Sequence, residues 1–336
     1  MGEAGVTGAV DHRGQRRFRH GVLIVDGQHT IERRLVPSLR RDITAGQAVF
    51  MVVGADTARI VRDRLGDDAD TLQWAPVDGF YQRLGFSYRS FDRYLRDQHD
   101  RQQPIHIVAE PGLVSDPRAP VDRVAAFLNY EAMANDRYAR YGSPITCLWH
   151  REHHPAWVID DVRKVHGQEL TARGDIDNPS YIAPAAYLNA RVPASLPAPP
   201  PVTDLDLTVW DFAEVAACRA AVARWASHHD FVPAAVRQVV AAGNEAVTNG
   251  LQHGQAPVQV RAWRRDTTLI LDIEDHGGQP IPADAGYRPP ATLAGPAGLW
   301  VARQLADVLL TSTHHGRTTV RMYFPHAVIH SNLDIP

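Results

Sequence analysis

Residues 242–254 read Ala-Gly-Asn-Glu-Ala-Val-Thr-Asn-Gly-Leu-Gln-His-Gly, and this stretch predicts the fold of the second half of the chain. Read as a helix, it continues an apolar or small stripe made of Val236, Val240, Gly243, Val247 and Leu251. Glu245 and Asn249 lie one turn apart on the opposite side, surrounded by Gln238, Ala242 and Gln252. Gly254 is expected to end the helix. The pattern predicts a helix that packs on a sheet and presents a carboxylate and an amide elsewhere.

A Glu and an Asn at this spacing most often form a solvated helix face, so their interpretation depends on the motifs that come later in the chain. A polar β-ribbon comes next, and then Asp275-His276-Gly277-Gly278. A loop rich in Pro and Ala leads to Gly295-Pro296-Ala297-Gly298-Leu299-Trp300. Each glycine motif is weak alone, whereas the three motifs in this order are specific.

This order resembles the nucleotide-binding domain of the GHKL superfamily, which includes gyrase, Hsp90, histidine kinases and MutL. Within it, the chain looks most like the anti-sigma factor serine/threonine kinases. The motifs that carry the resemblance are Glu-x-x-x-Asn with His-Gly, Asp-x-Gly, and a Gly-Leu-Trp helix start. They fall on Glu245, Asn249, His253, Gly254, Asp275, Gly277, Gly298, Leu299 and Trp300. The implied fold is a Bergerat-type α/β sandwich with a mixed or antiparallel sheet and helices on one face.

The resemblance implies that this domain binds ATP and Mg²⁺. Asn249 would offer a neutral oxygen to Mg²⁺, and Glu245 would act as the base for an attacking hydroxyl. Asp275 would accept a hydrogen bond from the adenine amino group, with Gly277 letting the backbone pass close to the base.

The other residues expected to bind the nucleotide lie around the phosphates. Gly295, Gly298 and the amides that open the Leu299 helix would surround these groups, and His253 and Gly254 complete the expected set. Residues 279–294 would form a lid over the nucleotide. The sequence departs from many relatives at Gln279, and at Pro296, which removes a phosphate-facing N–H.

Length and composition set the limits of the interpretation. A chain of 336 residues predicts two domains, and its net charge of −3 gives no case for direct nucleic-acid or membrane binding. Cys147 and Cys218 are far apart, which argues against a disulfide framework and fits a reducing cytoplasm. No apolar run reaches transmembrane length, so we expect a soluble, cytoplasmic protein.

The first half alternates short apolar runs with helical stretches. Strands are expected at 21–25, 48–54, 72–74, 105–108 and 145–149, and helices at 31–39, 60–65, 91–99 and 120–141. Continuous apolar strands of this kind predict a mostly parallel sheet covered by helices on both faces. Gly54, Glu110 and His150 follow the carboxyl ends of strands, where ligands of such sheets bind.

No phosphate-binding loop motif occurs in this half. The region 18–190 instead resembles the MEDS domain, a degenerate RecA-like sensory module of bacteria. The matching pieces are the opening strand, Glu110-Pro111, Tyr130-Glu131, His166 and Pro179-Ser180-Tyr181. The resemblance implies that this half senses a small-molecule ligand, without naming the ligand.

Cys147, His150, His153 and His154 form a Cys-x-x-His-x-x-His-His cluster whose donor types suit zinc. A strand would point Cys147 and His150 to opposite faces, so solvent-exposed loop histidines are the favoured interpretation, and metal binding is left open.

The expected organisation is a disordered tail (1–18), a MEDS-like sensory domain (19–191), a proline-rich linker (192–202), an ATPase domain (203–326) and a C-terminal tail (327–336). Five prolines in the linker suggest that residues from about 200 onward fold alone.

We expect an anti-sigma factor that phosphorylates a serine of an anti-anti-sigma (STAS-type) protein and binds a sigma factor, under control of the sensory domain. One alternative is a pseudokinase that sequesters the sigma factor without turnover. A sensor histidine kinase is disfavoured because a proline linker, not a helical hairpin with an acceptor histidine, precedes the ATPase domain. Homodimer formation is left open.

Overall fold

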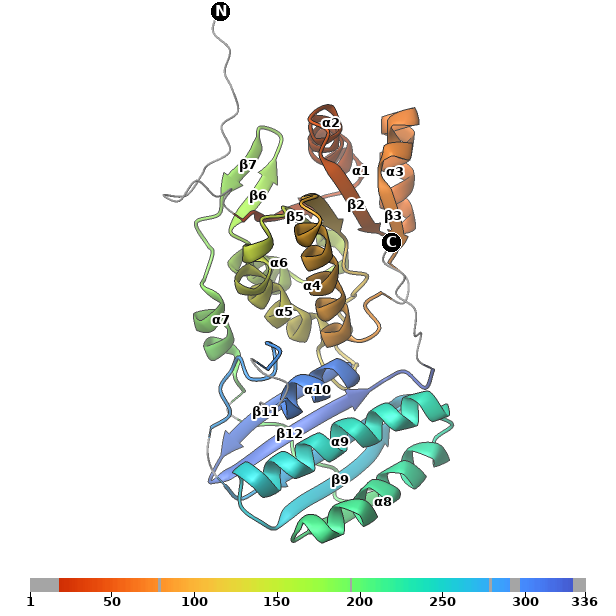
Figure 1. Ribbon diagram of the computed structural model, residues 1–336, viewed down its shortest axis with the longest axis vertical. Coiled ribbons are helices and arrows are strands. Elements are labelled where there is room, and N and C mark those ends of the chain that lie inside the picture. Colours follow the sequence, from red (N-terminus) through yellow and green to blue (C-terminus); the bar gives the residue numbers. More distant parts are fainter. Residues whose placement is uncertain (1–17, 78–79, 194, 278–279, 291–296, 329–336) are drawn as a thin grey trace, which may run out of the picture.

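The computed structural model describes residues 18–77, 80–193, 195–277, 280–290 and 297–328. Figure 1 shows two layered α/β domains, with the N-terminal sheet and its helices above a second sheet. The expected tail 1–18 and the end of the C-terminal tail lie almost wholly outside the described residues, as do Gly295, Pro296 and Gln279.

The N-terminal sheet has seven strands in the order β3-β2-β4-β5-β1-β6-β7, and only the β6–β7 pair is antiparallel. The strands are β1 (His20–Val25), β2 (Ala48–Val53), β3 (Gln73–Pro76), β4 (Ile105–Ala109), β5 (Ile145–His150), β6 (Gln168–Thr171) and β7 (Gly174–Asp177). The mostly parallel sheet confirms the predicted fold class. The β6–β7 hairpin was not predicted, because its short, polar strands carry no apolar run.

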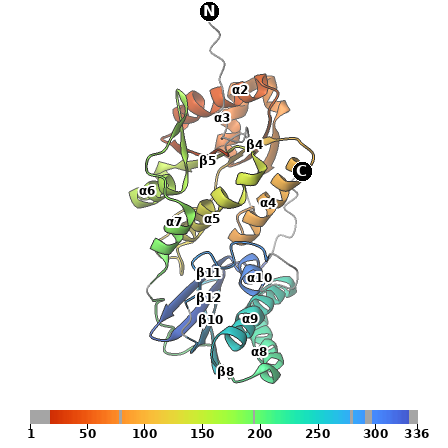
Figure 2. The ribbon, with the colours of Figure 1, turned by 60° about the vertical axis from the view of Figure 1, so that its left-hand side comes forward.

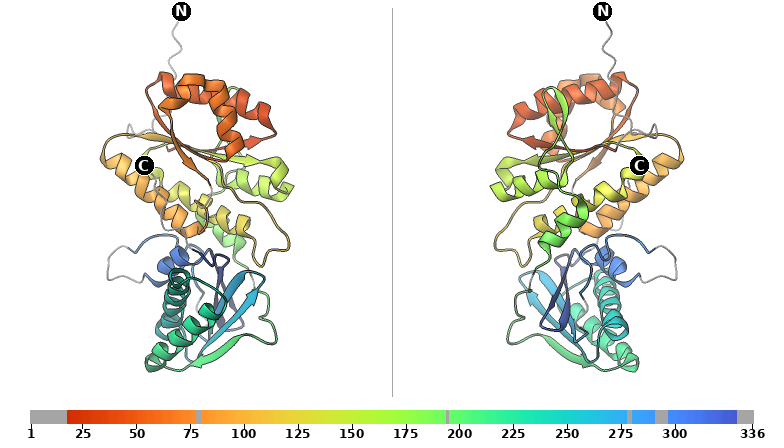
Figure 3. Two further views of the ribbon diagram at one scale, coloured as in Figure 1. Left: turned by 90° about the vertical axis from the view of Figure 1, so that its right-hand side faces the viewer. Right: turned by 90° about the vertical axis from the view of Figure 1, so that its left-hand side faces the viewer.

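Helices cover both faces of this sheet (Figure 3). The helical elements are α1 (Gln28–Thr30), α2 (Val36–Thr44), α3 (Ala55–Leu65), α4 (Leu84–Asp100), α5 (Arg123–Arg137), α6 (Ala156–Val165) and α7 (Pro184–Arg191). Neighbouring residues of one strand enter different cores: Leu23 packs with α2 and α3, and Val22 packs with α4 and α5. This double burial explains the continuous apolar strands.

Several N-terminal helices extend beyond or fall short of their expected bounds, and the reason is clear for α5 and α4. Helix α5 begins at Arg123 because the Asp122 carboxylate caps it, accepting a hydrogen bond from the Ala125 N–H at 2.9 Å. Helix α4 begins seven residues before the expected Phe91, because its first turns pack against the second domain.

The C-terminal sheet has five strands in the order β11-β12-β10-β9-β8, all antiparallel. The strands are β8 (Leu205–Val209), β9 (Val258–Arg265), β10 (Thr268–Asp275), β11 (Val308–His314) and β12 (Arg317–Phe324). Three helices lie on one face of it (Figure 2): α8 (Val215–His228), α9 (Pro233–His253) and α10 (Gly298–Leu305). The predicted α/β sandwich is therefore confirmed, with an antiparallel sheet.

Helix α9 is more deeply buried than the predicted single stripe. Ala242 and Ala246, on the side expected to be polar, are almost fully buried, whereas Val240 and Leu251 are only partly buried. The reason is that α9 packs against α8 on one side and α10 on the other, as well as on the sheet. Glu245 and Asn249 of α9 remain partly exposed.

The two domains share a core. Ile270, Val308 and Tyr323 of the second sheet belong to the same buried cluster as residues of α4 and α5. At Gly85 of α4 a β-carbon would lie 2.0 Å from the carbonyl oxygen of Arg303 in α10, so only glycine permits this approach. This shared core is at odds with the expectation that the second domain folds alone, because separation would expose its apolar face.

An ion pair joins the domains beside this core. The Arg123 guanidinium forms two hydrogen bonds, of 2.6 and 2.8 Å, to the carboxylate of Asp307, which is almost fully buried. Burial raises the pKa of Asp307, and the nearby Arg123 opposes that rise. The main effect of the pair on stability is therefore that the Arg123 cation neutralises the buried Asp307 carboxylate.

In the described part of the chain, no helix combines the length and the apolar character needed to cross a membrane.

We predict that Arg123→Ala destabilises the protein by about 3 kcal/mol, because it leaves the Asp307 carboxylate buried without its cation. Urea unfolding followed by tryptophan fluorescence measures this change. Arg118→Ala is the matched control, since Arg118 is exposed and pairs with an exposed Asp116; its effect should stay within about 0.5 kcal/mol. Equal effects of the two substitutions would contradict the assigned role of the inter-domain pair.

Candidate functional site

A cleft of about 420 Å³ opens between α9, α10 and the end of β10. Its volume lies within the range typical of sites for small molecules and cofactors. The predicted residues that line it are Asn249, His253, Gly254, Asp275, Gly298 and Leu299. The structure therefore brings together in one cleft residues from all three sequence motifs.

One end of the cleft is formed by Gly254 and Asp275, and the predicted Gly277 does not line the cleft but packs against these two residues. A β-carbon at Gly254 would lie 2.3 Å from Asp275 Oδ1, and one at Gly277 would lie 2.4 Å from the Gly254 Cα. The Gly277 N–H donates a 2.8 Å hydrogen bond to Asp275 Oδ1. Burial raises the pKa of Asp275, while the backbone hydrogen bonds oppose that rise. A buried carboxylate that still has capacity to accept a hydrogen bond suits a ligand that donates an N–H.

The other end of the cleft lies where α10 begins beside α9. A β-carbon at Gly298 would lie 2.6 Å from the Asn249 amide nitrogen, so the first turn of α10 is pressed against that side chain. The unpaired N–H groups of this turn and its positive dipole end favour an anion. Asn249 and the start of α10 thus place an amide oxygen and backbone donors on the same wall.

Glu245 lies one turn before Asn249 on α9 and is half-buried. Within the described residues it has no ion-pair or hydrogen-bonded partner, so its carboxylate is not occupied by a structural role. It is not among the residues that line the cleft. Glu245, the predicted base, therefore lies beside the cleft and does not form part of its wall.

The predicted lid corresponds in part to residues 280–290, which line the cleft through Ile281, Ala285 and Gly286. This segment is fastened to the rest of the molecule. The Tyr287 ring packs edge-on against Tyr130 of α5, with ring centroids 4.9 Å apart. The Arg303 guanidinium lies over the Tyr287 ring and donates to the Ala285 carbonyl at 2.9 Å. The lid thus contacts the N-terminal domain directly.

Thr318 also lines the cleft and was not predicted. It pairs with Asp275 across the β10–β12 ladder, which places it at the buried end of the site. The only sequence signal was its position at the start of an apolar strand, and register cannot be assigned from that. Trp300, which the Gly-Leu-Trp motif contains, also lines the cleft and is covered by the Arg89 guanidinium of α4.

In the N-terminal domain, the three residues expected at the strand ends come together. His150 Nε2 lies 3.1 Å from Glu110 Oε1, and the Gly54 N–H donates to Glu110 Oε2 at 3.1 Å. The close contact with the Glu110 carboxylate raises the pKa of His150. Burial alone would raise the pKa of Glu110, but the nearby His150 and Thr57 side chains and the hydrogen bond from the Gly54 N–H lower it.

The Cys147–His154 cluster does not assemble as one site. Cys147 faces His20 and Glu131, whereas His150 faces Glu110 and stacks on His153 at 5.2 Å. His154 packs against the Trp149 ring instead. Successive side chains of β5 point to opposite faces of the sheet, and this separates Cys147 from His150, as expected.

Comparison with family models assigns both domains. Residues 19–167 match the MEthanogen/methylotroph, DcmR Sensory domain (MEDS), and residues 210–324 match the histidine kinase-like ATPase domain. No curated protein matched the chain. Residues 19–167 therefore form a MEDS sensory domain and residues 210–324 a histidine kinase-like ATPase domain of the GHKL type, and the cleft lies in the second of these domains.

We predict that Gly254→Ala weakens nucleotide binding about tenfold or more, because the added β-carbon would overlap the Asp275 carboxylate. Calorimetric titration with MgATP measures the affinity. Gly167→Ala is the control, since a β-carbon there meets nothing within 4 Å. Unchanged affinity in Gly254→Ala would remove Asp275 from the site.

We also predict that the Glu110–His150 pair stabilises the fold most between the ordinary pKa values of the two groups, 4.5 and 6.5. The contribution from His150 disappears as pH rises through its raised pKa, and that from Glu110 disappears as pH falls through its lowered pKa. Urea unfolding of the parent and Glu110→Gln across pH 4 to 9 measures the difference. A difference that does not vary with pH would show that the pair is not ionised.

Proposed function

We propose that the protein is a signalling regulator that binds ATP with Mg²⁺ in its second domain and phosphorylates a serine or threonine of a partner protein. The observation that carries the proposal is the meeting of Asn249, Asp275 and Gly298 in one cleft of nucleotide size.

Adenine binds at the Asp275 end, where the carboxylate oxygen not used by Gly277 accepts the amino group. The phosphates bind at the other end, against the N–H groups that begin α10. Asn249 lies next to that helix start and holds Mg²⁺ through its amide oxygen. Bound Mg²⁺ neutralises charge on the phosphates during transfer.

Glu245 is the group of this chain that accepts the proton of the attacking hydroxyl. It lies one turn from Asn249 on the same helix and has no ion-pair partner within the described residues. Glu245 directly precedes Ala246, which lines the cleft, so a partner's hydroxyl brought to the cleft would approach it.

The partners are an anti-anti-sigma protein of STAS type, which receives the phosphoryl group, and a sigma factor, which the ATPase domain binds. The motif pattern of anti-sigma factor kinases supports this proposal. The described residues between α7 and β8 contain no helix, which weighs against a histidine kinase with a helical hairpin before its ATPase domain.

The sensory domain controls the ATPase domain through the lid. Tyr287 of the lid packs on Tyr130 of α5, and Arg288 of the lid forms a 2.9 Å ion pair with Asp136 of the same helix. A shift of α5 on ligand binding would therefore change how the lid covers the cleft.

A second candidate is a regulator that binds the nucleotide and sequesters the sigma factor without turnover. Glu245 is absent from the residues that line the cleft, and this favours binding without catalysis. Asn249→Ala abolishes Mg²⁺-dependent ATP binding under either proposal.

We predict that Glu245→Gln keeps MgATP affinity but lowers transfer to the partner's serine by about 10²–10⁴-fold, because the amide cannot accept the proton. Purified protein, labelled ATP and an anti-anti-sigma protein provide the assay. Glu152→Gln, an exposed glutamate of the other domain, is the control. Equal transfer rates for the parent and Glu245→Gln would show that Glu245 is not the base. If the parent transfers no phosphate at all, the second candidate, which sequesters the sigma factor without turnover, is favoured instead.

A further inference from the structure

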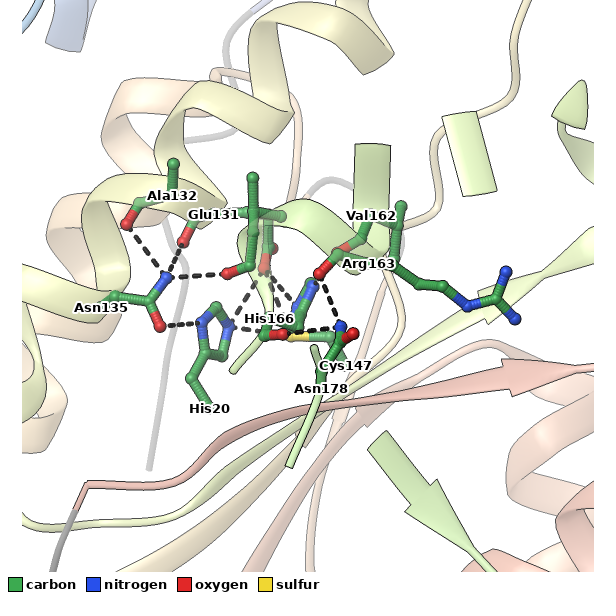
Figure 4. A network of polar contacts seen from close by, with 10 residues as sticks. His20, Glu131, Ala132, Asn135, Cys147, Val162, Arg163, His166 and Asn178 are labelled. Atoms are coloured by element: carbon green, nitrogen blue, oxygen red, sulfur yellow. Dashed lines mark hydrogen bonds and ion pairs between the residues drawn. The ribbon is translucent and has the colours of Figure 1, made fainter. Parts of the chain in front are cut away.

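Four side chains of metal-binding types meet inside the N-terminal domain (Figure 4). His20 begins β1, Glu131 lies in α5, Cys147 lies in β5 and His166 follows α6. All four are buried, and their ligand atoms lie within 4.8 Å of one another. This cluster is independent of the proposed function of the second domain.

Hydrogen bonds fix which nitrogen of each imidazole faces the cluster. His166 Nδ1 donates to the Val162 carbonyl at 2.7 Å, so in the neutral ring Nε2 carries the lone pair. The Asn135 amide nitrogen donates to three backbone carbonyls, which turns its oxygen toward His20 Nδ1 at 3.2 Å. His20 Nδ1 is therefore also the donor, and both Nε2 lone pairs point inward (Figure 4).

Of the six pairs of inward atoms, four have distances within or just below the range of a tetrahedral site. Glu131 Oε2 lies 3.2 Å from His20 Nε2 and 3.1 Å from His166 Nε2. Cys147 Sγ lies 3.6 Å from His20 Nε2 and 3.5 Å from Glu131 Oε2. Zinc bonds of about 2.0–2.3 Å at tetrahedral angles place neighbouring ligand atoms about 3.3–3.8 Å apart.

The charges of the cluster also call for a cation. Two imidazole lone pairs directed at a carboxylate repel one another unless something positive lies between them. His166 Nε2 has no hydrogen-bond partner of good geometry despite its short distance to Glu131.

We propose that His20, Glu131, Cys147 and His166 bind one Zn²⁺ ion. Binding displaces the Cys147 proton to solvent, and the thiolate, the carboxylate and two neutral imidazoles then balance the two positive charges. The mixed nitrogen, sulfur and oxygen donors favour zinc over magnesium or calcium. A cavity of about 40 Å³, lined in part by Tyr81, Tyr88 and Phe127, adjoins the site and has room for a water molecule.

The test uses tag-free full-length protein. Its metal content is measured by mass spectrometry, and the protein stripped with a chelator is then titrated with Zn²⁺ and with Co²⁺. Cobalt reports a thiolate ligand through a sulfur-to-metal charge-transfer band. The variants are Cys147→Ser and His166→Gln, and circular dichroism checks that each is folded.

Two controls match the variants. Cys218→Ser removes the other buried thiol, which lies in the second domain. The double variant His314→Ala/His315→Ala removes an adjacent histidine pair, with ring centroids 3.8 Å apart, that a metal could bind adventitiously.

We expect about one zinc per chain, a charge-transfer band that Cys218→Ser retains and Cys147→Ser loses, and affinity about 100-fold or more weaker in His166→Gln. Parent protein that binds neither Zn²⁺ nor Co²⁺ would overturn the zinc site, even if the variants fail to fold. Metal lost only in the His314→Ala/His315→Ala variant would overturn it as well.

Discussion

The Arg303 guanidinium is the contact on which the arrangement of the two domains depends. It is almost fully buried, donates to the carbonyls of Ala285 in the lid and Leu309 in β11, and covers the Tyr287 ring. Its partners include these carbonyls, the Tyr287 ring and the Tyr130 hydroxyl of α5, so it interacts with backbone and aromatic groups of both domains. The lid, α10 and the second sheet are therefore fixed around one side chain, and the carbonyl of that residue touches α4 at Gly85.

Helix α5 links the lid of the second domain to the buried His-Cys cluster of the sensory domain. Tyr130, which contacts the lid, directly precedes Glu131, which lies in the buried His-Cys cluster of the sensory domain. Helix α5 thus carries a lid contact and a cluster ligand on successive residues. Because packed cores respond as units, a rearrangement at Glu131 would reach the lid without any long-range flexible segment.

Much of this structure could be predicted from the sequence, for identifiable reasons. Apolar runs buried on both faces indicated the parallel sheet, and the family resemblance of three motifs grouped Asn249, Asp275 and Gly298, which the structure brings together in one cleft. What could not be predicted depends on tertiary contacts. The burial of Ala242 comes from α8 and α10, Thr318 depends on strand register, and His20 meets Glu131 only through the sheet topology. The proline linker likewise gave no sign that the domains share a core.

Hydrogen exchange of residues 280–290 and α10 in Gly85→Ala, compared with Gly167→Ala, tests most directly whether the sensory domain holds the lid. The added methyl at Gly85 would clash with the Arg303 carbonyl, whereas a methyl at Gly167 meets nothing. We expect faster exchange in the lid and α10 of Gly85→Ala, with unchanged exchange in β9 and β10. Identical exchange in the lid of both variants would contradict control of the nucleotide cleft by the sensory domain.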